Sequence, residues 1–364
     1  FITLISCKDS KPDDLSYLQA INDSIKQVYA PDKRVAIYNI DLSFDGNELQ
    51  LRGETDQKKA LAALIDHLKN NGKEFKNSVL TLPDSSVGNF PYALGNNSVA
   101  NIRSNAKHSG ELATQAILGM PLKVLKIAGD FYLVQSPDGY ISWVDHGGVT
   151  LFSNEQFLDW DKTDKVIYTK TVGFVYGQTR NELDKISDIV LGSQLLLLEI
   201  SGEYYKVQYP DKRVGYLKQS ECQLYDKWVR DVQASGALIE LYARDLLGSP
   251  YLWGGTSSKG MDCSGFTKTV YLMNGFIIPR DASQQIMAGN NVDPELKFKD
   301  LQKGDLMFFG RKATDSARQR VTHVGIWLGN EKGEFIHASG RVKIGSIDQN
   351  SARYDAFNTN RYLG

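Results

Sequence analysis

The sequence predicts a multidomain α+β protein with an N-terminal α/β segment, two small β-barrels and a C-terminal α+β domain. Three observations lead to this prediction. Helical and strand-like runs alternate through the first part of the chain, a series of short strands occurs twice in the middle, and a glycine-rich turn near Gly254 precedes a helix and a β-hairpin. At 364 residues the chain is long enough for several hydrophobic cores.

Residues 1–12 combine an apolar start with an abruptly polar continuation. The stretch Leu4-Ile5-Ser6-Cys7 resembles the bacterial lipobox, whose cysteine is lipidated and becomes the mature N-terminus. The charged stretch after Cys7 would serve as a tether, and Phe1 would be the tail of a truncated leader. We therefore expect an anchor at Cys7 that holds the protein to a membrane without crossing it. The alternative is an incidental cysteine at a frayed terminus.

Residues 13–94 are predicted to form a small αββαβ domain whose sheet buries one face against its helices. The spacing of apolar residues separates helical runs from alternating, strand-like ones. The expected elements are a helix over residues 15–25, strands over 34–42 and 48–52, a helix over 57–70 and a strand over 79–82. We assign no chemistry to this domain and interpret it as a scaffold.

The middle of the chain contains an internal repeat. Gly119 aligns with Gly192, an offset of 73 residues, and the match continues without gaps through the strand-like runs that follow. Each copy is a series of short alternating strands broken by Gly, Pro and Asp, which is typical of a small β-barrel. We place the two barrels at residues 95–150 and 165–235, with residues 151–164 as a polar connector.

Cys263 is the strongest candidate for chemistry in the last domain, residues 236–364. It follows the glycine-rich stretch Tyr251-Leu252-Trp253-Gly254-Gly255 and starts a helical pattern that continues to Met273. A thiol at a helix start feels the positive end of the helix dipole, which favours the nucleophilic thiolate. The glycines allow the backbone to turn sharply and to approach a substrate closely. A buried structural cysteine is the alternative.

Two of the five histidines follow Cys263 on neighbouring strand-like runs. His323 lies in the run over residues 322–328 and His337 in the run over 334–339, with a loop containing Gly and Asn between them. This pattern predicts a β-hairpin that brings the two imidazoles side by side. A catalytic thiol needs an imidazole to take its proton and a polar group to orient that imidazole. Ordinary strand histidines and a zinc site built from the same three side chains are the alternatives.

From Leu238 to Gly364 the sequence resembles the NlpC-type family of bacterial cell-wall cysteine peptidases, a compact relative of the papain fold. Both barrels resemble the bacterial SH3-like domains that are often attached to wall peptidases. The chain departs from the family pattern in a polar insert over residues 311–320, which we expect to be a surface loop. Six ordered motifs carry the resemblance, at residues 250–255, 262–266, 280–285, 303–309, 322–326 and 335–338.

The resemblance implies a catalytic role for four residues. Cys263 would be the nucleophile, His323 the base and His337 the residue that orients it. Tyr251 and the backbone N–H of Cys263 would face the developing oxyanion. Ser264 and Trp253, which lie within the matching motifs, are expected to contact the substrate.

The resemblance also implies a pocket shared between domains. In multidomain relatives the first SH3-like domain leans over the cleft and narrows it toward peptides with a free amino terminus. Here the amine would be held by Glu111 and Asp281, with Tyr140 as a wall of the pocket. Such a division is physically reasonable because a desolvated ammonium needs a carboxylate and further hydrogen bonds. In the second barrel the positions of Glu111 and Tyr140 are taken by Asp184 and Arg213.

The function implied by the family is that of a cysteine peptidase acting on murein peptides. It would cut the γ-D-glutamyl bond to diaminopimelate or lysine in peptides with a free L-Ala terminus, releasing L-Ala-D-Glu without a metal or cofactor. One alternative is a D,L-endopeptidase acting on intact peptidoglycan, with the SH3-like domains as wall-targeting modules. A second is a non-catalytic lipoprotein that binds muropeptides.

Composition limits the remaining classes of function. A net charge of −1 argues against nucleic acid as a partner. Apolar residues make up 41% and charged residues 23%, as is usual in globular proteins, and no apolar run approaches the length of a membrane-spanning helix. Three cysteines do not suggest a disulfide framework. We expect a monomer in the bacterial cell envelope, as a periplasmic or outer-membrane lipoprotein.

Overall fold

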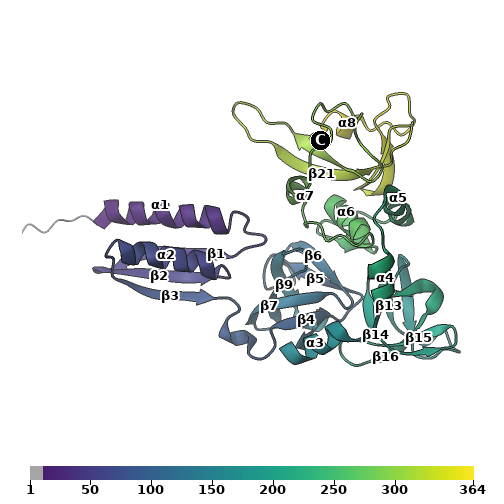
Figure 1. The fold of residues 1–364 in the computed structure, drawn as a ribbon, viewed down its shortest axis with the longest axis horizontal. Coiled ribbons are helices and arrows are strands. Elements are labelled where there is room, and N and C mark those ends of the chain that lie inside the picture. The colour runs from purple at the N-terminus through teal and green to yellow at the C-terminus, as the bar shows by residue number, and fades with distance from the viewer. Residues whose placement is uncertain (1–10) are drawn as a thin grey trace, which may run out of the picture. The chain divides into compact units, whose positions relative to one another are not determined.

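The computed structural model describes residues 11–364, and Cys7, the expected lipidation site, lies outside them. The chain divides after Gly88 into two compact units, and the second contains both barrels and the C-terminal domain (Figure 1). Among residues 11–364, no helix combines the length and the apolarity that crossing a bilayer requires.

The first unit has the expected αββαβ order. In its sheet, β2 pairs antiparallel with β1 and parallel with β3. Apolar side chains of α2 and alternate residues of β1 are buried in one core, so the helices cover one face of the sheet. The elements are α1 (Lys11–Tyr29), β1 (Tyr38–Asp45), β2 (Glu48–Thr55), α2 (Lys58–Asn70) and β3 (Phe75–Thr81).

The internal repeat is present strand for strand in the two barrels. The strand order β10-β4-β7-β8-β9-β5-β6 of the first barrel is matched by β17-β11-β14-β15-β16-β12-β13 in the second. The first barrel comprises β4 (Tyr92–Gly95), β5 (Val99–Arg103), β6 (Leu112–Ile117), β7 (Pro121–Ala128), β8 (Phe131–Gln135), β9 (Ile141–Asp145) and β10 (Val149–Phe152). The second comprises β11 (Lys165–Tyr168), β12 (Val172–Tyr176), β13 (Lys185–Val190), β14 (Gln194–Ser201), β15 (Tyr204–Gln208), β16 (Val214–Lys218) and β17 (Cys222–Leu224).

The structure shifts the expected start of the first barrel. Strand β4 begins before the boundary at residue 95 and pairs with both β7 and β10, so it belongs to the barrel. The sequence did not reveal it because four residues are too few to show alternation. The expected connector, residues 151–164, consists of the end of β10 and a helix, α3 (Asn154–Lys162), which starts with a capping box between Ser153 and Gln156.

The C-terminal domain packs one buried helix against a four-stranded antiparallel sheet. Every residue of α6 from Cys263 to Val270 is buried, and Phe266 and Val270 meet Ile326 and Ile336 of the sheet in one core. The sheet order is β20-β21-β22-β23. After α4 (Tyr225–Asp231), the elements are α5 (Gly236–Asp245), β18 (Thr256–Ser257), β19 (Gly260–Met261), α6 (Cys263–Leu272), α7 (Ala282–Ala288), β20 (Leu306–Arg311), β21 (Arg320–Trp327), β22 (Glu334–Ser339), β23 (Arg341–Ser346) and α8 (Ala356–Thr359).

The polar insert forms the tip of the β20–β21 hairpin. Residues 311–316 are exposed, and the backbones of Thr314 and Ala317 exchange hydrogen bonds across the tip. The insert is therefore a surface loop, as the sequence predicted, and it lengthens the spacing between Cys263 and His323 without interrupting either element.

Buried polar contacts join the first barrel to the C-terminal domain. The ammonium of Lys268, on α6, lies 2.6 Å from the carboxylate of Asp138, whose side chain is fully buried. The side-chain oxygen of Gln115, on β6, accepts a 2.9 Å hydrogen bond from the backbone N–H of Thr256. Helix α6 thus lies between the four-stranded sheet and the barrels (Figure 1). These contacts fix the first barrel against the helix that begins at Cys263.

The buried ion pair between Asp138 and Lys268 should contribute to the stability of the folded protein. Burial alone would raise the pKa of Asp138, but the charge and hydrogen bond of Lys268 outweigh it and hold the pKa below its usual value. Asp138→Asn leaves the Lys268 ammonium buried without a counter-charge, which should lower the free energy of unfolding by about 3 kcal/mol. Denaturant unfolding at neutral pH measures the loss.

The matched control is Asp211→Asn, at the equivalent position of the second barrel. Asp211 pairs with Arg213 near the surface, so we expect a loss within about 1 kcal/mol. Because the pKa of Asp138 is depressed in the folded state, its contribution is present above the usual carboxyl pKa and is lost as pH falls through the folded value. The gap between wild type and Asp138→Asn should therefore shrink in acid, and a constant gap would contradict the assignment.

Candidate active site

Cys263 is the first residue of α6, and the helix start is fixed by its N-cap. The carboxylate of Asp262 accepts a 2.7 Å hydrogen bond from the backbone N–H of Gly265, which satisfies one of the free donors of the first turn. The Cys263 side chain packs against Val324 and Phe308 of the sheet. Since Val324 follows His323 directly, this contact brings the cysteine next to the strand that carries the histidine.

The resting thiol is protonated at neutral pH. Burial, with the nearby Asp262 carboxylate as the second cause, raises the pKa of Cys263 to about 11. Hydrogen bonds from the backbone N–H groups of Val324 and Ser264 act in the opposite direction but do not offset the burial. The sequence led us to expect that the helix dipole favours the thiolate, and burial acts in the opposite direction.

A buried ion pair ties the glycine-rich turn to the helix start. Arg280, which is 1% exposed, donates hydrogen bonds of 3.1 and 2.6 Å to the two carboxylate oxygens of Asp262. Asp262 also accepts a 3.0 Å hydrogen bond from the backbone N–H of Gly254. Gly254 has φ +79, and a Cβ there would lie 2.1 Å from the carbonyl oxygen of Leu112 in the first barrel. A glycine is needed here both for the turn and for the approach of the barrel.

Ser264 lies inside this network. Its hydroxyl donates to Asp262 over 3.2 Å and accepts from Arg280 over 3.0 Å, and the residue is 5% exposed. Both partners of the hydroxyl are internal, and its expected contact with substrate stays a prediction. Ser264 instead helps to hold the ion pair in place.

The two histidines are brought together by the hairpin that the sequence predicted. His323 Nε2 and His337 Nδ1 lie 2.7 Å apart, from strands β21 and β22, which pair antiparallel. Gly325 makes room for this contact, since a Cβ there would lie 3.2 Å from the Cβ of His337. Both rings are edge to face, and His337 is fully buried.

Both imidazoles are neutral at neutral pH. Burial lowers the pKa of His323 to about 4 and that of His337 to about 3. A neutral His323 can accept a proton, and with Nε2 engaged by His337 its free ring nitrogen is Nδ1. The protonated thiol and the two neutral imidazoles leave this group of side chains uncharged at neutral pH.

The contact between the imidazoles does not suit the zinc alternative. Ring nitrogens that share a metal both point at the ion from about 2.0 Å, whereas these two point at each other across a hydrogen bond. Within the described part of the chain, no group of three or more His, Cys, Asp or Glu side chains has the arrangement of a metal site.

Tyr251 and the Cys263 backbone supply donors beside the sulfur. Burial, followed by the charges of Cys263 and Asp262, raises the pKa of Tyr251 to about 12, so its hydroxyl remains a donor across the working pH range. The backbone N–H of Cys263 is in the first turn of α6, where no intrahelical acceptor is available. These two donors have the character of an oxyanion site.

Glu111 of the first barrel meets the glycine-rich turn. Trp253, which is 64% exposed, donates a 2.6 Å hydrogen bond from Nε1 to a carboxylate oxygen of Glu111. Glu111 itself is exposed to solvent. The two residues that the sequence assigned to substrate binding from different domains therefore lie in contact.

Tyr140 and Asp281 both lie near Arg280. Tyr140 is half-buried in the loop that carries Asp138, and it has a minor electrostatic influence on the Arg280 guanidinium. Asp281 caps α7 in a capping box with Gln284, and its carboxylate is 3.9 Å from Arg280. At 30% exposure the Asp281 side chain is accessible while it caps the helix. Both residues therefore lie near the Arg280 guanidinium, which also binds Asp262 at the start of α6.

Three contributors were missed by sequence reasoning. Asp355 lies 3.7 Å from His337, at the start of the short helix α8, and nothing in the local sequence links it to the hairpin. Asp138 and Lys268 form the ion pair between domains, and their separation along the chain conceals the contact. Only the position of Asp355 as an N-cap residue could have been anticipated.

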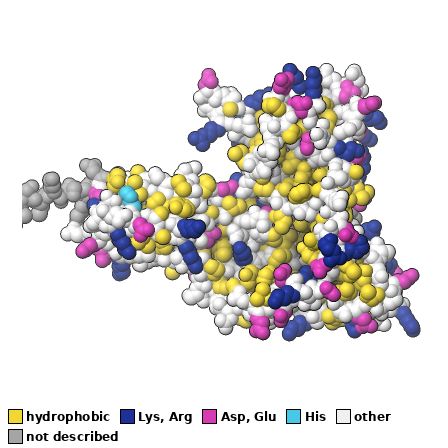
Figure 2. Space-filling model, viewed as in Figure 1, with side chains coloured by type: hydrophobic (Ala, Val, Ile, Leu, Met, Phe, Trp, Pro, Cys, Tyr) yellow, Lys and Arg dark blue, Asp and Glu magenta, His cyan; other side chains and the backbone are white. Residues whose placement is uncertain are grey.

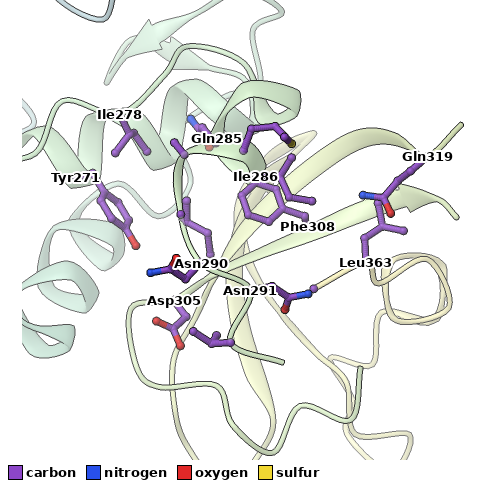
Figure 3. A pocket seen from close by; sticks show the side chains of 16 residues that line it. Tyr271, Ile278, Gln285, Ile286, Asn290, Asn291, Asp305, Phe308, Gln319 and Leu363 are labelled. Atoms are coloured by element: carbon purple, nitrogen blue, oxygen red, sulfur yellow. The ribbon is translucent and has the colours of Figure 1, made fainter. Parts of the chain in front are cut away.

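A cavity of about 570 Å³ is lined mainly by residues of α7, of β20 and of the segment that joins them (Figure 3). Ile286, Phe308 and Leu363 line it and also belong to the apolar cluster around Cys263. Asn290, Asn291 and Asp305 add polar groups to its wall (Figure 3). Apolar side chains also gather on the molecular face drawn in Figure 2, over the C-terminal domain. Cys263, His323 and His337 are not among the residues that line the cavity.

The raised pKa of Cys263 predicts how the rate of thiol alkylation depends on pH. Because the thiol stays protonated until about pH 11, alkylation by iodoacetamide should accelerate about tenfold per pH unit from about pH 7 to about pH 10. Peptide mapping by mass spectrometry locates the label, and Cys222→Ala removes the second buried thiol as a control. A rate that is level across this range would indicate a preformed thiolate and contradict the protonated resting thiol.

Comparisons with known proteins identify two of the domains. The profile of the NlpC/P60 family matches residues 248–361, and that of the bacterial dipeptidyl-peptidase Sh3 domain matches residues 102–148. A crystal structure of an NlpC/P60 family protein from Bacillus cereus covers 75% of this chain and 98% of its own, with a TM-score of 0.63 at 27% identity. The predicted multidomain fold, with SH3-like and NlpC/P60 domains, is confirmed.

Two relatives extend the match across several domains. The gamma-D-glutamyl-L-lysine dipeptidyl-peptidase of Bacillus cereus is 33% identical over 241 residues, which is 64% of this chain and 68% of the relative. Dipeptidyl-peptidase 6 of Lysinibacillus sphaericus is 27% identical over 267 residues, 70% of this chain and 92% of the relative.

Proposed function

The chain belongs to the NlpC/P60 family of cysteine peptidases, and on this premise we propose that it hydrolyses the γ-D-glutamyl bond to a diamino acid in murein peptides. The peptides would carry a free N-terminal L-Ala, and the product would be L-Ala-D-Glu. Cys263, His323 and His337 act as nucleophile, base and orienting residue in this proposal. We propose that the enzyme is a monomer.

One observation carries the proposed specificity. The exposed carboxylate of Glu111, from the first barrel, is held by Trp253 in the same turn that presents Tyr251 to the thiol. A peptide ammonium that leaves water needs such a carboxylate, and a charged hydrogen bond of this kind is among the stronger ones. The relatives named as dipeptidyl-peptidases match this chain over several domains, which also supports a site shared between the barrel and the peptidase domain.

The reaction follows from the protonation states of the resting site. His323 takes the thiol proton as the Cys263 sulfur forms a bond to the γ-carbonyl carbon, and the oxyanion meets the backbone N–H of Cys263 and the Tyr251 hydroxyl. The His323 imidazolium then gives its proton to the departing amine of the diamino acid, and the C–N bond breaks. Water, deprotonated by His323, then attacks the thioester carbonyl carbon. The C–S bond breaks, the His323 imidazolium returns its proton to the Cys263 sulfur, and L-Ala-D-Glu leaves.

The proposal predicts how the enzyme treats the substrate's amino end. L-Ala-γ-D-Glu-L-Lys and the diaminopimelate form should be cleaved, and N-acetylation should lower kcat/KM at least about tenfold because it removes the ammonium that Glu111 binds. Glu111→Gln should lower kcat/KM for the free peptide by about 10- to 100-fold and leave the acetylated peptide unaffected. Chromatographic assay of the released amine measures both.

Two controls accompany this experiment. Asp184→Asn changes the equivalent position of the second barrel, where the carboxylate bonds to Gln178, and should leave both rates unchanged. Cys263→Ala should abolish cleavage. Undiminished cleavage of the acetylated peptide would sink the free-amine model, and faster release from intact sacculi than from the tripeptide would favour a D,L-endopeptidase.

Membership of a family of cell-wall peptidases indicates an envelope or extracytoplasmic location. We propose in addition that Cys7 is lipidated, on the strength of the motif Leu4-Ile5-Ser6-Cys7. Metabolic labelling of cells with an alkyne fatty acid should tag the wild-type protein and leave Cys7→Ser untagged. Equal labelling of the two proteins would overturn the anchor.

A further inference from the structure

The second nitrogen of His337 has an unusual environment. His337 Nε2 is buried and has no hydrogen-bond partner among the described residues. The side chain that faces it is Asp355, whose carboxylate oxygen Oδ2 lies 3.7 Å away and whose side chain is 16% exposed. A buried ring nitrogen beside a carboxylate is costly unless it carries a proton directed at that carboxylate.

The protons of the two imidazoles can be assigned in sequence. His323 must keep Nδ1 unprotonated to accept the thiol proton, so the proton of its neutral ring is on Nε2. That proton is donated across 2.7 Å to His337 Nδ1, which must then be unprotonated. The proton of His337 is left on Nε2, the nitrogen that faces Asp355. The catalytic tautomer of His323 therefore requires one tautomer of His337.

From this arrangement we propose that Asp355 is a positioning residue that fixes the tautomer of His337 and, through it, that of the base His323. A carboxylate only accepts hydrogen bonds, so it stabilises the Nε2–H form of His337 over the alternative. At 3.7 Å the contact is longer than a hydrogen bond, and catalytic contacts of this kind often shorten when substrate binds. The triad becomes a linear array of four side chains.

Hydrogen bonds from Asn358 hold the carboxylate of Asp355 in place. Its Oδ1 accepts a 3.0 Å hydrogen bond from the backbone N–H of Asn358, and its Oδ2 accepts a 2.7 Å hydrogen bond from the Asn358 side-chain amide. The backbone N–H of Asp355 donates to Ser346 O over 2.9 Å, at the end of β23. Asn358 is 4% exposed, so this support is itself fixed in the interior.

The charges around the two rings differ in sign. Lys343 on β23 pairs in register with His337, and Arg361 follows α8, and both positive charges oppose protonation of His323. Asp262, before α6, favours protonation, but Asp355 gives the largest electrostatic contribution in that direction. Asp355 is thus the main charge that would stabilise the imidazolium formed when His323 takes the thiol proton.

The tautomers can be measured directly by long-range ¹H–¹⁵N NMR of protein labelled in its five histidines. We expect the Nε2–H tautomer at both His323 and His337 in the wild type. Asp355→Asn should shift His337 toward the Nδ1–H form, because the amide has one acceptor oxygen where the carboxylate has two, for the two N–H groups of Asn358 and for His337. The wild-type spectrum tests the proposal even if the variant does not fold, and an Nδ1–H tautomer at wild-type His337 would overturn it.

Kinetics distinguish positioning from a structural role. Asp355→Asn should lower kcat about tenfold with KM changed less than about twofold. When His337 is replaced by Asn, Asp355→Asn should lower kcat less than about twofold, because Asp355 then has no imidazole through which to act on His323. Equal losses in both backgrounds would overturn the proposal in favour of a structural role. Ser235→Ala, which removes the N-cap of α5, is the control for a lost helix cap and should leave kcat unchanged.

This kinetic arm rests on the proposed function, since it needs a substrate that the enzyme cleaves. The NMR arm does not. A failure of the murein peptide as substrate would therefore leave the tautomer result intact, and a wrong tautomer would overturn the role of Asp355 without affecting the identity of the substrate.

Discussion

The buried ion pair between Asp262 and Arg280 holds the site together. It caps the helix that starts with Cys263, fixes the backbone of Gly254, and occupies the hydroxyl of Ser264. Removing one partner of such a pair strands a buried charge, which typically costs about 3–5 kcal/mol. The pair therefore sets the position of Cys263 and of the turn that meets the first barrel.

Burial gives the site its chemical character. The thiol and both imidazoles lie in a setting that disfavours charge, so the resting site is neutral, and charge develops only as the reaction proceeds. Groups that are already oriented, such as the Cys263 N–H and the Tyr251 hydroxyl, can then stabilise that charge without reorganising. Asp355 would stabilise the positive charge on His323 in the same way.

Sequence reasoning predicted the parts that depend on local pattern. The repeat, the hairpin of His323 and His337 and the helix that starts at Cys263 follow from spacing and turn residues, and all are present. It failed where distant segments meet. Asp355 has no local signal that links it to His337, and the thiol pKa depends on a burial that only the packed structure reveals. The family resemblance, not periodicity, led to Glu111.

We propose above all that the peptide's amino end is held at the junction of the first barrel and the peptidase domain. A crystal structure of Cys263→Ala with L-Ala-γ-D-Glu-L-Lys tests it most directly. We predict the ammonium within hydrogen-bond distance of the Glu111 carboxylate and the γ-carbonyl carbon beside residue 263. An amino end that points into solvent, away from the barrel, would contradict the account.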